Sequence, residues 1–196
     1  MSAERNDAGP ALTAEQRLAL LELARGAVGQ VAAAAGPPPA PENPGAPPPG
    51  LDRPGAAFVT LRVGGTLRGC IGACEPHASL WSTVHEMASA AATRDPRFPP
   101  ITARDLDDLS VEISVLSPER VIHDASEIEI GRHGLEVRRR MARGLLLPQV
   151  ATEHRFDRER FLAETCRKAG LPPDAWRDPA TEVWLFEADV FSEADG

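Results

Sequence analysis

The sequence predicts an α+β protein with a largely antiparallel sheet and flanking helices. Three observations indicate this class: strand-like runs come in adjacent pairs, helical segments gather around those pairs, and strand and helix do not alternate strictly. The chain has 196 residues, of which 42% are hydrophobic. That content is enough for a substantial core in a chain of this length.

The N-terminal segment predicts one amphipathic helix after a flexible tail at residues 1–11. The helix is expected over residues 12–36, because Thr13 and Gln16 have the spacing of a capping box. Apolar residues recur at helical spacing and mark its buried face, namely Leu21, Ala24, Val28 and Val31.

A proline-rich segment follows at residues 36–54. It contains nine prolines, which exclude both a helix and a central strand. One helix before it is too little to fold alone. We therefore predict a surface loop within a single domain that spans residues 12–192.

The clearest local signal is a β-hairpin in AAFVTLRVGGTLRGCIG, residues 56–72. Two strand-like runs flank Gly64–Gly65, a pair that can supply positive φ at both central positions of a tight turn. This turn pairs Val63 with Thr66.

The register of the hairpin decides where Cys70 points. Counted from the turn without a break, it pairs Leu61 with Arg68 and Val59 with Cys70. Side chains alternate along a strand, so Arg68 and Cys70 are expected on one face, together with the apolar side chains of the facing strand.

The middle of the chain predicts a helix and then a strand. The run SLWSTVHEMASAAATRD, residues 79–95, is typical of a helix capped by its first serine. DPRFPP, residues 95–100, ends that helix. LSVEISVLS, residues 109–117, alternates apolar and polar positions as a half-buried strand does.

The last third predicts further strands and one more helix. Residues 126–150 are expected to form strand, turn, strand, turn and strand. Asp157 then caps a helix that runs to about Gly170, a typical residue for a helix C-terminus. TEVWLFEADVF, residues 181–191, closes the chain as a strand.

Charge and cysteine content argue against several classes of protein. The net charge of −8 argues against a general nucleic-acid binder and disfavours anionic membranes. No apolar run approaches the roughly 20 residues that a membrane span needs. Three cysteines without dense spacing, and an N-terminus without an apolar secretion signal, predict a cytoplasmic protein.

Four motifs occur in the order that is typical of the AMMECR domain family. They are LRGCIG (residues 67–72), DPRFPPIT (95–102), IGRHGL (130–135) and LLPQVATE (146–153). The segment ETCRKAGLPPDAW, residues 164–176, is similar to that of the family's bacterial branch, AmmeMemoRadiSam system protein A.

The resemblance runs from about Leu12 to Phe191 and implies a two-lobed α+β domain. Genes of this family often lie beside those of a Memo-like protein and a radical SAM protein. The resemblance therefore implies a shared pathway or complex, with those two proteins as expected partners. It implies no settled activity.

Two interpretations of Cys70, which the resemblance places at the family's hallmark position, remain open. The nearby Arg68 would stabilise a thiolate, while Gly69 and Gly72 would let a substrate or another backbone approach closely. These features suit a nucleophile. The expected register also places Cys70 among apolar side chains, and a cysteine there often simply packs.

A nucleophilic thiol needs a base and groups that bind an oxyanion or a substrate. His133, which matches the family's glycine-flanked histidine, is the expected base. The alternative is that His133 only occupies a turn, because histidine tolerates positive φ better than most residues. Glu112 and Glu153 are candidate orienting carboxylates, although a solvated side chain is the simpler interpretation of each. Gln149 is a candidate oxyanion donor, and the alternative is that it only caps the local backbone. We expect Gln149 and Glu153 to contact a substrate.

A structural zinc site is the remaining alternative for Cys70. Cys74, His77 and His85 follow it, but their spacing is unlike the short regular pairs of zinc sites, and we predict no metal. We also expect no cofactor, because the sequence has no Gly-rich phosphate loop, dinucleotide fingerprint or radical SAM cluster motif.

Two further features are expected to be structural. Cys166 lies at helical spacing within an apolar face, which predicts a core position. RRRMAR, residues 138–143, predicts a solvated hairpin tip, with a patch for an acidic partner or a phosphate as the alternative.

The sequence thus supports two hypotheses. In the first, the chain is an enzyme that acts on a small organic substrate, with Cys70 as nucleophile, Arg68 as its electrostatic support and His133 as its base. In the second, the same motifs form a docking surface for a Memo-like or radical SAM protein, and Cys70 is structural. The two hypotheses differ in whether the sulfur is accessible.

Overall fold

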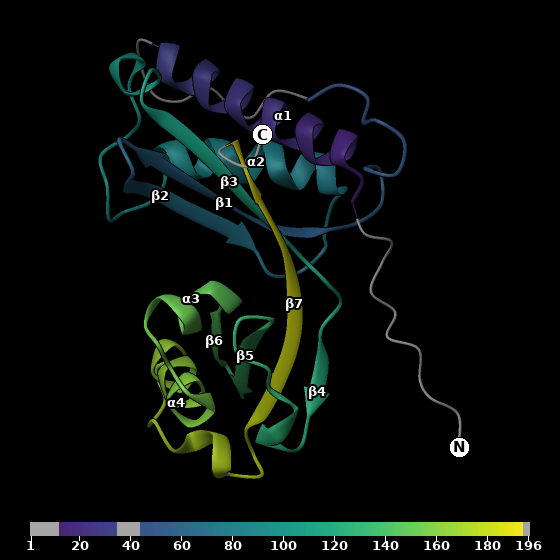
Figure 1. Ribbon diagram of the computed structural model, residues 1–196, viewed down its shortest axis with the longest axis vertical. Coiled ribbons are helices and arrows are strands. Elements are labelled where there is room, and N and C mark those ends of the chain that lie inside the picture. The colour runs from purple at the N-terminus through teal and green to yellow at the C-terminus, as the bar shows by residue number, and fades with distance from the viewer. Residues whose placement is uncertain (1–11, 35–43, 194–196) are drawn as a thin grey trace. The chain divides into compact units, whose positions relative to one another are not determined.

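The structure is a computed structural model that describes residues 12–34 and 44–193 (Figure 1). Within these residues the chain forms two compact units. The large unit holds the chain up to Leu116 and again from Asp189, and the small unit holds Ser117–Ala188. The predicted tail and part of the predicted proline-rich loop lie outside the described residues.

The large unit is a helix-covered antiparallel sheet. Its elements are α1 (Ala14–Ala33), β1 (Ala56–Val63), β2 (Thr66–Ala73), α2 (Leu80–Thr93), the short turn η1 (Ala103–Asp105) and β3 (Leu109–Leu116). The strand order is β2-β1-β3, which leaves β2 at the edge. Both helices lie on one face of this sheet, with α2 packed on β1 and β2 (Figure 1).

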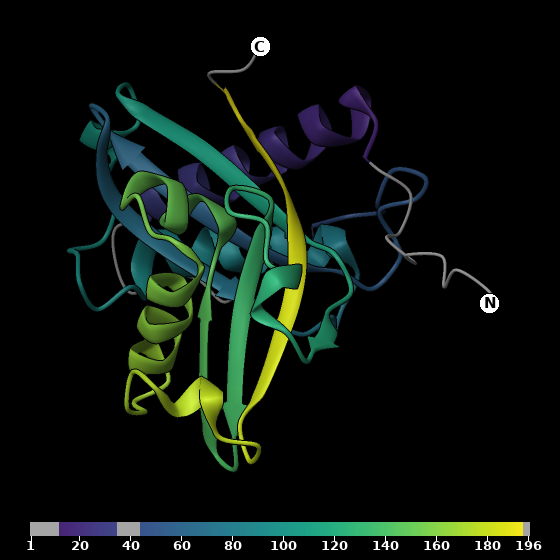
Figure 2. The same cartoon turned by 60° about the horizontal axis from the view of Figure 1, so that its bottom comes forward.

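The small unit is a second antiparallel sheet with its own helices. Its elements are β4 (Arg120–Ile122), η2 (Ala125–Glu127), β5 (His133–Arg139), β6 (Ala142–Leu146), α3 (Pro148–Glu153), α4 (Arg158–Lys168), η3 (Ala175–Arg177) and β7 (Glu182–Ser192). β7 lies between β4 and β5, and β6 pairs with β5. Figure 2 shows α4 beside this sheet. The predicted α+β class with an antiparallel sheet is confirmed.

The predicted first helix is confirmed together with its cap. The Thr13 hydroxyl accepts a hydrogen bond from the Gln16 N–H at 3.2 Å, and the Gln16 side chain accepts one from the Thr13 N–H at 3.0 Å. The four predicted apolar positions are buried and join a core that includes Leu61, Val84 and Ile113. Local capping and apolar spacing are therefore enough to place α1.

One predicted strand in the last third is wrong. Of the three strands expected over residues 126–150, only β5 and β6 form. The first run folds into η2 because Asp124 accepts a hydrogen bond from the Ser126 N–H and caps the turn. The last expected strand forms as β6 but ends at Leu146, and the residues after it begin α3, with Pro148 at its first position, where proline is favoured.

The predicted helix after Asp157 and the final strand are confirmed. Asp157 accepts a hydrogen bond from the Arg160 N–H at 2.8 Å, and Gly170 has φ +73 just beyond the helix. α4 packs its apolar face on β5 and β6. The small unit thereby gains a separate core, which includes Leu135, Val137, Phe161, Leu162 and Leu185.

The basic segment at residues 138–143 is a hairpin tip, as predicted, and Arg140 and Met141 are exposed there. Two of its arginines, however, are not simply solvated. Arg138 and Arg143 are cross-strand partners, and both bind the fully buried carboxylate of Glu136. The Arg138 guanidinium also lies 4.4 Å from the centre of the Trp184 ring. These two arginines are therefore structural, because a buried carboxylate needs counter-charges.

The last strand passes from the small unit into the large one. Beyond Ala188 the chain contributes two acidic side chains to the large unit. Asp189 pairs with Arg17 of α1 at 3.0 Å, and Glu193 accepts a hydrogen bond from the Val111 N–H of β3 at 2.9 Å. Among the described helices, none combines the length and the apolar character that a membrane crossing requires.

Candidate functional site

The β1–β2 hairpin carries Cys70 and closes with the predicted glycine turn. Gly64 and Gly65 have φ +55 and +77, and Val63 pairs with Thr66. Glycine adopts such angles at no steric cost, and a Gly-Gly pair is therefore favoured in this kind of turn. The prediction of the turn is confirmed.

A β-bulge follows this turn and changes the register beyond it. The register shifts beside Leu61, and Arg68 becomes the extra, unpaired residue of β2. Cys70 therefore pairs with Thr60. The predicted pairing of Cys70 with Val59 is wrong, because the extra residue moves every later pair by one position.

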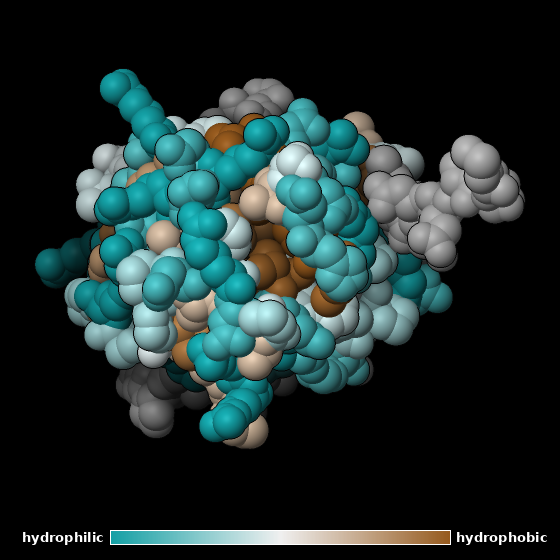
Figure 3. All heavy atoms as spheres, turned by 90° about the horizontal axis from the view of Figure 1, so that it is seen from below, coloured by the Kyte–Doolittle hydropathy of each residue, from teal (hydrophilic) through white to brown (hydrophobic). Residues whose placement is uncertain are grey.

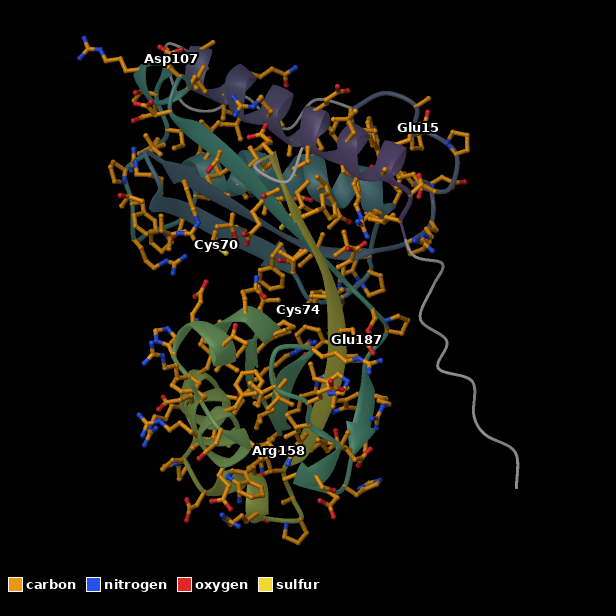
Figure 4. All side chains as sticks on the ribbon, viewed as in Figure 1. Glu15, Cys70, Cys74, Asp107, Arg158 and Glu187 are labelled. Carbon is orange, nitrogen blue, oxygen red and sulfur yellow. The ribbon has the colours of Figure 1, made fainter. Side chains whose placement is uncertain are left out.

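The shift turns Cys70 away from the core. Val59 and Leu61 are fully buried beneath the helices, whereas Cys70 is half-buried on the opposite face of the sheet (Figure 4). There the Thr60 hydroxyl donates a hydrogen bond to the Cys70 Sγ atom at 3.3 Å. Cys70 is thus not packed among the apolar side chains of β1.

Cys70 belongs to a polar row that crosses three strands. Thr60 lies opposite Cys70 on one side and opposite Glu112 of β3 on the other. Residues directly opposite in antiparallel strands share a face. We name Cys70, Thr60 and Glu112 the polar row. It unites a thiol, a hydroxyl and a carboxylate on one sheet face.

The loop after α2 caps the backbone of β2 at Cys70. Asp95 is only 5% exposed and accepts a hydrogen bond from the Cys70 N–H at 2.9 Å. Arg97 binds the same carboxylate at 2.7 Å and donates to the Cys70 carbonyl at 3.4 Å. Hydrogen bonding from the Arg97 guanidinium holds the pKa of Asp95 well below its usual range. The loop therefore replaces a neighbouring strand at the sheet edge.

Arg68 reaches the same loop. Its guanidinium donates to the Pro99 carbonyl at 3.1 Å and lies 3.6 Å from the Asp105 carboxylate. Both contacts tie the bulge of β2 to the segment that follows α2. The expected support of a Cys70 thiolate by Arg68 stays a prediction.

The two glycines beside Cys70 are accounted for by packing inside the large unit. A Cβ atom on Gly69 would lie 2.1 Å from the Ala91 carbonyl oxygen of α2. One on Gly72 would lie 2.2 Å from the Phe58 ring. The protein itself occupies both spaces, so a substrate contact at either glycine stays a prediction.

His133 begins β5 in the small unit and is buried. Its Nδ1 atom accepts a hydrogen bond from the Glu129 N–H at 3.0 Å, so the neutral ring carries its proton on Nε2. Burial lowers the pKa of His133 and favours this neutral form. The positive φ of this turn belongs to Gly131, at +89, so tolerance of positive φ does not explain His133.

The other cysteine and histidine side chains considered as sites are either buried or exposed, as follows. Cys166 is fully buried, and burial raises the pKa of its thiol, which confirms the predicted core position. His85 is buried on α2, and His77 is exposed and pairs with Glu75 at 3.1 Å. In the part of the chain that the structure describes, no three His, Cys, Asp or Glu side chains come together as metal ligands would.

Comparison with known proteins identifies the family. The AMMECR1 family model matches residues 21–191, most of the chain. The chain belongs to the AMMECR1 family. The resemblance that the four motifs indicated is confirmed at the level of the family.

Relatives in the AMMECR1 family match over most of their own length. A protein from Methanothermobacter thermautotrophicus is 52% identical over 142 residues, which cover 69% of this chain and 74% of the relative. One from Methanosarcina acetivorans is 44% identical over 163 residues, or 78% and 81% of the two chains. These relatives are archaeal, and assignment to the bacterial branch stays a prediction.

A crystal structure in this family has the same fold. An uncharacterised protein from Pyrococcus horikoshii matches with a TM-score of 0.85 and 41% sequence identity, over 93% of both chains. The match confirms the α+β architecture over nearly the whole AMMECR1 chain.

The predicted catalytic residues of this AMMECR1 chain lie in both units. Cys70 and Arg68 belong to the large unit, and His133 belongs to the small unit. Gln149, half-buried, and Glu153, exposed, lie on α3 of the small unit. The joint action of these groups stays a prediction.

Two residues around Cys70 were missed by sequence reasoning. Thr60 could not be found, because its contact with the sulfur depends on the bulge. Asp95 carried a signal, since an aspartate two residues before Arg97 in a proline-rich turn is well placed for a local ion pair. Its second contact, with the Cys70 backbone, joins two of the four family motifs.

Proposed function

We propose that this AMMECR1-family protein is an enzyme that uses the Cys70 sulfur as a nucleophile on a small organic substrate. The observation that carries the proposal is the direction of Cys70, which the bulge turns out of the core and onto the polar row. The thiolate is the reactive form of a cysteine, and a hydroxyl that donates to sulfur stabilises that negative charge. Thr60 is that donor.

Fixed backbone geometry also supports a reactive role for Cys70. Its N–H and its carbonyl are both bound by the loop, through Asp95 and Arg97. A nucleophile that is already held in one place loses little freedom when it reacts. If the Cys70 side chain only filled space, hydrogen bonds to both its N–H and its carbonyl would not be needed.

The local geometry suggests a different role for His133 from the base that the sequence indicates. Nδ1 is engaged by the Glu129 N–H, and Nε2 carries the proton in the neutral ring. To accept a proton, the ring would first have to release the Glu129 amide. We therefore propose His133 as a hydrogen-bond donor through Nε2.

The Thr60→Val substitution tests whether the Thr60 hydroxyl activates the Cys70 sulfur. The substitution keeps the side-chain shape and removes the donor to sulfur, so alkylation of Cys70 by iodoacetamide should slow about fivefold, as expected for the loss of one hydrogen bond of about 1 kcal/mol. The rate is measured on the native protein by mass spectrometry of the peptide that contains Cys70. Thr66→Val, at the exposed end of the hairpin, is the matched control and should leave the rate unchanged.

Two results would contradict the proposal. One is an equal rate in the Thr60→Val and wild-type proteins. The other is that Cys70 resists alkylation in the native protein as strongly as the buried Cys166, and reacts only after unfolding.

The class of substrate can be identified by trapping the substrate on Cys70. Purified protein is incubated with a cell extract, and the mass of the Cys70 peptide is compared with that of a Cys70→Ser variant. We expect an adduct on Cys70 that the variant lacks, and its mass gives the class of the substrate.

A second proposal is that the protein is a binding module for a Memo-like or radical SAM protein. The contact between Asp95 and Cys70 supports it, because it brings two family motifs together. Sedimentation of the protein with each recombinant partner tests it, and Cys70→Ser should then bind as well as wild type. We also propose a cytoplasmic location, supported by three cysteines that are all thiols.

A further inference from the structure

Arg62 of β1 carries a positive charge without a counter-charge. It is half-buried, and among the described residues its side chain has no ion pair and no hydrogen bond. A charge that is partly removed from water is costly unless another group compensates it. The other half-buried arginines that the structure describes all have a partner, namely Arg17, Arg25, Arg53, Arg68, Arg138 and Arg139.

The register of the sheet places Arg62 on the face that carries the polar row. β1 pairs with β3 without interruption, so the side chains of β1 alternate regularly between the two faces. Val59 and Leu61 are buried beneath the helices. Thr60 and Arg62 therefore lie on the other face. Because Thr60 is directly opposite Cys70, Arg62 is a diagonal neighbour of Cys70, about 7–8 Å away and within reach of a long side chain.

The residues directly opposite Arg62 carry no charge. Arg62 pairs with Leu67 of β2 and with Ser110 of β3. An acidic side chain at either position would be the usual cross-strand partner of an arginine. The sheet therefore leaves the guanidinium uncompensated and places a hydroxyl beside it.

The two other arginines close to the Cys70 segment already have acidic partners. Arg68 lies 3.6 Å from the Asp105 carboxylate, and Arg97 binds Asp95 at 2.7 Å. Hydrophilic side chains cover most of the face that Figure 3 shows, and the whole chain has a net charge of −8. A protein with this balance attracts anions where a cation is left uncompensated. Arg62 provides such a place on the sheet of the large unit.

We propose that Arg62 binds the charged group of the substrate of Cys70, and that this substrate is a small organic anion, either a carboxylate or a phosphate ester. The inference rests on the nucleophilic role proposed for Cys70 and adds the class of its substrate. A guanidinium suits both kinds of anion, because it presents parallel N–H donors to two oxygens. Glu112 of the polar row repels an anion, so the charged group is expected beside Ser110, with the electrophilic carbon towards the sulfur.

Two alkylating reagents of similar size test the preference for an anion. Iodoacetate carries a negative charge, and iodoacetamide is neutral. In both reactions the Cys70 thiolate forms a bond to carbon, and iodide leaves with the electron pair of the broken carbon–iodine bond. Both rates are measured on the native full-length protein by mass spectrometry of the Cys70 peptide. Their ratio is divided by the ratio for 2-mercaptoethanol, a neutral thiol, and we expect iodoacetate to be favoured about tenfold.

Arg62→Gln tests whether this preference comes from Arg62. The substitution keeps a polar side chain but removes the charge, so the ratio of the two rates should fall to that of the neutral thiol. Arg62→Lys keeps the charge without the paired donors and should retain part of the preference. Arg104→Gln is the matched control. Arg104 of η1 also has no side-chain partner among the described residues, but it is exposed, and its loss should leave the ratio unchanged.

A second measurement does not depend on the thiol. Acetate and inorganic phosphate are titrated separately into a Cys70→Ser variant, and the Nε–H signal of Arg62 is followed by nuclear magnetic resonance. The same variant with Arg62→Gln identifies that signal. We expect a saturable shift with at least one of the two anions, and the anion that saturates at the lower concentration gives the charged group of the substrate.

The outcomes separate this inference from the role proposed for Cys70. If iodoacetamide alkylates native Cys70 but iodoacetate is not favoured, or if the preference survives in Arg62→Gln, the anion site is overturned and the nucleophile stands. If neither reagent reacts, the nucleophilic role fails and the titration decides. A saturable shift then supports an anion site without the nucleophile, and the absence of such a shift overturns the anion site as well.

Discussion

Asp95 is the residue on which the geometry around Cys70 depends most. It accepts hydrogen bonds from the Cys70 backbone and from Arg97, and it is almost fully buried. A buried carboxylate is stable only with such partners. The edge of β2 and the loop after α2 are therefore held together through one side chain.

Asp95→Asn should lower the free energy of unfolding by about 1–3 kcal/mol at pH 7, because a buried charge-assisted hydrogen-bond set is weakened. The pKa of Asp95 is depressed in the folded state. Its ionised form therefore stabilises the protein above the ordinary aspartate pKa of about 4, and this contribution is lost as the pH falls towards the folded-state value. The difference between the two proteins should be constant from pH 7 to about pH 4 and shrink below it.

Urea unfolding at a series of pH values measures this difference. Asp107→Asn, at an exposed aspartate of the large unit, is the matched control and should cost little at any pH (Figure 4). A difference that grows on acidification would contradict the role assigned to the Asp95 carboxylate.

At the scale of elements, glycine and phenylalanine are paired in both sheets. Gly72 of β2 lies opposite Phe58 of β1, and Gly134 of β5 lies opposite Phe186 of β7. In each pair a Cβ atom on the glycine would meet the ring at less than 2.5 Å. The ring covers the backbone that the glycine leaves bare, which explains why these strands tolerate glycine.

Gly69→Ala should destabilise the protein by about 3 kcal/mol, because its Cβ atom would collide with backbone rather than with a movable side chain. That backbone is the Ala91 carbonyl of α2. Gly26→Ala is the matched control: Gly26 lies in α1, and nothing stands within 4 Å of its added Cβ. This control should raise stability by about 0.5–1 kcal/mol, since alanine favours a helix interior. Thermal unfolding of both variants measures the contrast, and a Gly69→Ala protein as stable as wild type would rule out the close approach of α2.

The elements that sequence reasoning placed correctly are those with local signals. α1 and α4 carry their own caps at Thr13 and Asp157, and the Gly64–Gly65 pair predicts the hairpin turn. The bulge at Arg68 could not be foreseen in the same way. It depends on contacts with Pro99 and Asp105, which are remote in sequence.

This difference explains why the sequence identified Cys70 as a candidate but did not predict the face of the sheet on which its side chain lies. Its motif is visible in the sequence, but a one-residue change of register decides its face. The same holds for its partners, since Thr60 becomes a neighbour of the sulfur only through the bulge.

At the scale of the whole molecule, each unit has a core of its own. Ile113 belongs to the core of the large unit and Phe161 to that of the small unit, and both side chains are fully buried. Separate cores predict separate cooperative units.

Phe161→Ala should cost about 3–5 kcal/mol through the cavity that it leaves. Hydrogen exchange should accelerate mainly in β5 and α4, and a matched Ile113→Ala variant should accelerate it mainly in β1 and β3. Equal acceleration throughout the chain in both variants would show a single cooperative unit.

The course of β7 fixes an order of events during synthesis. The small unit is one continuous stretch, Ser117–Ala188, and all of it has left the ribosome before the large unit has its last residues. Asp189 and Glu193 emerge after the whole small unit, yet they bind Arg17 of α1 and the backbone of β3. The large unit begins earlier along the chain but is completed only after the small unit, because it still needs these two carboxylates.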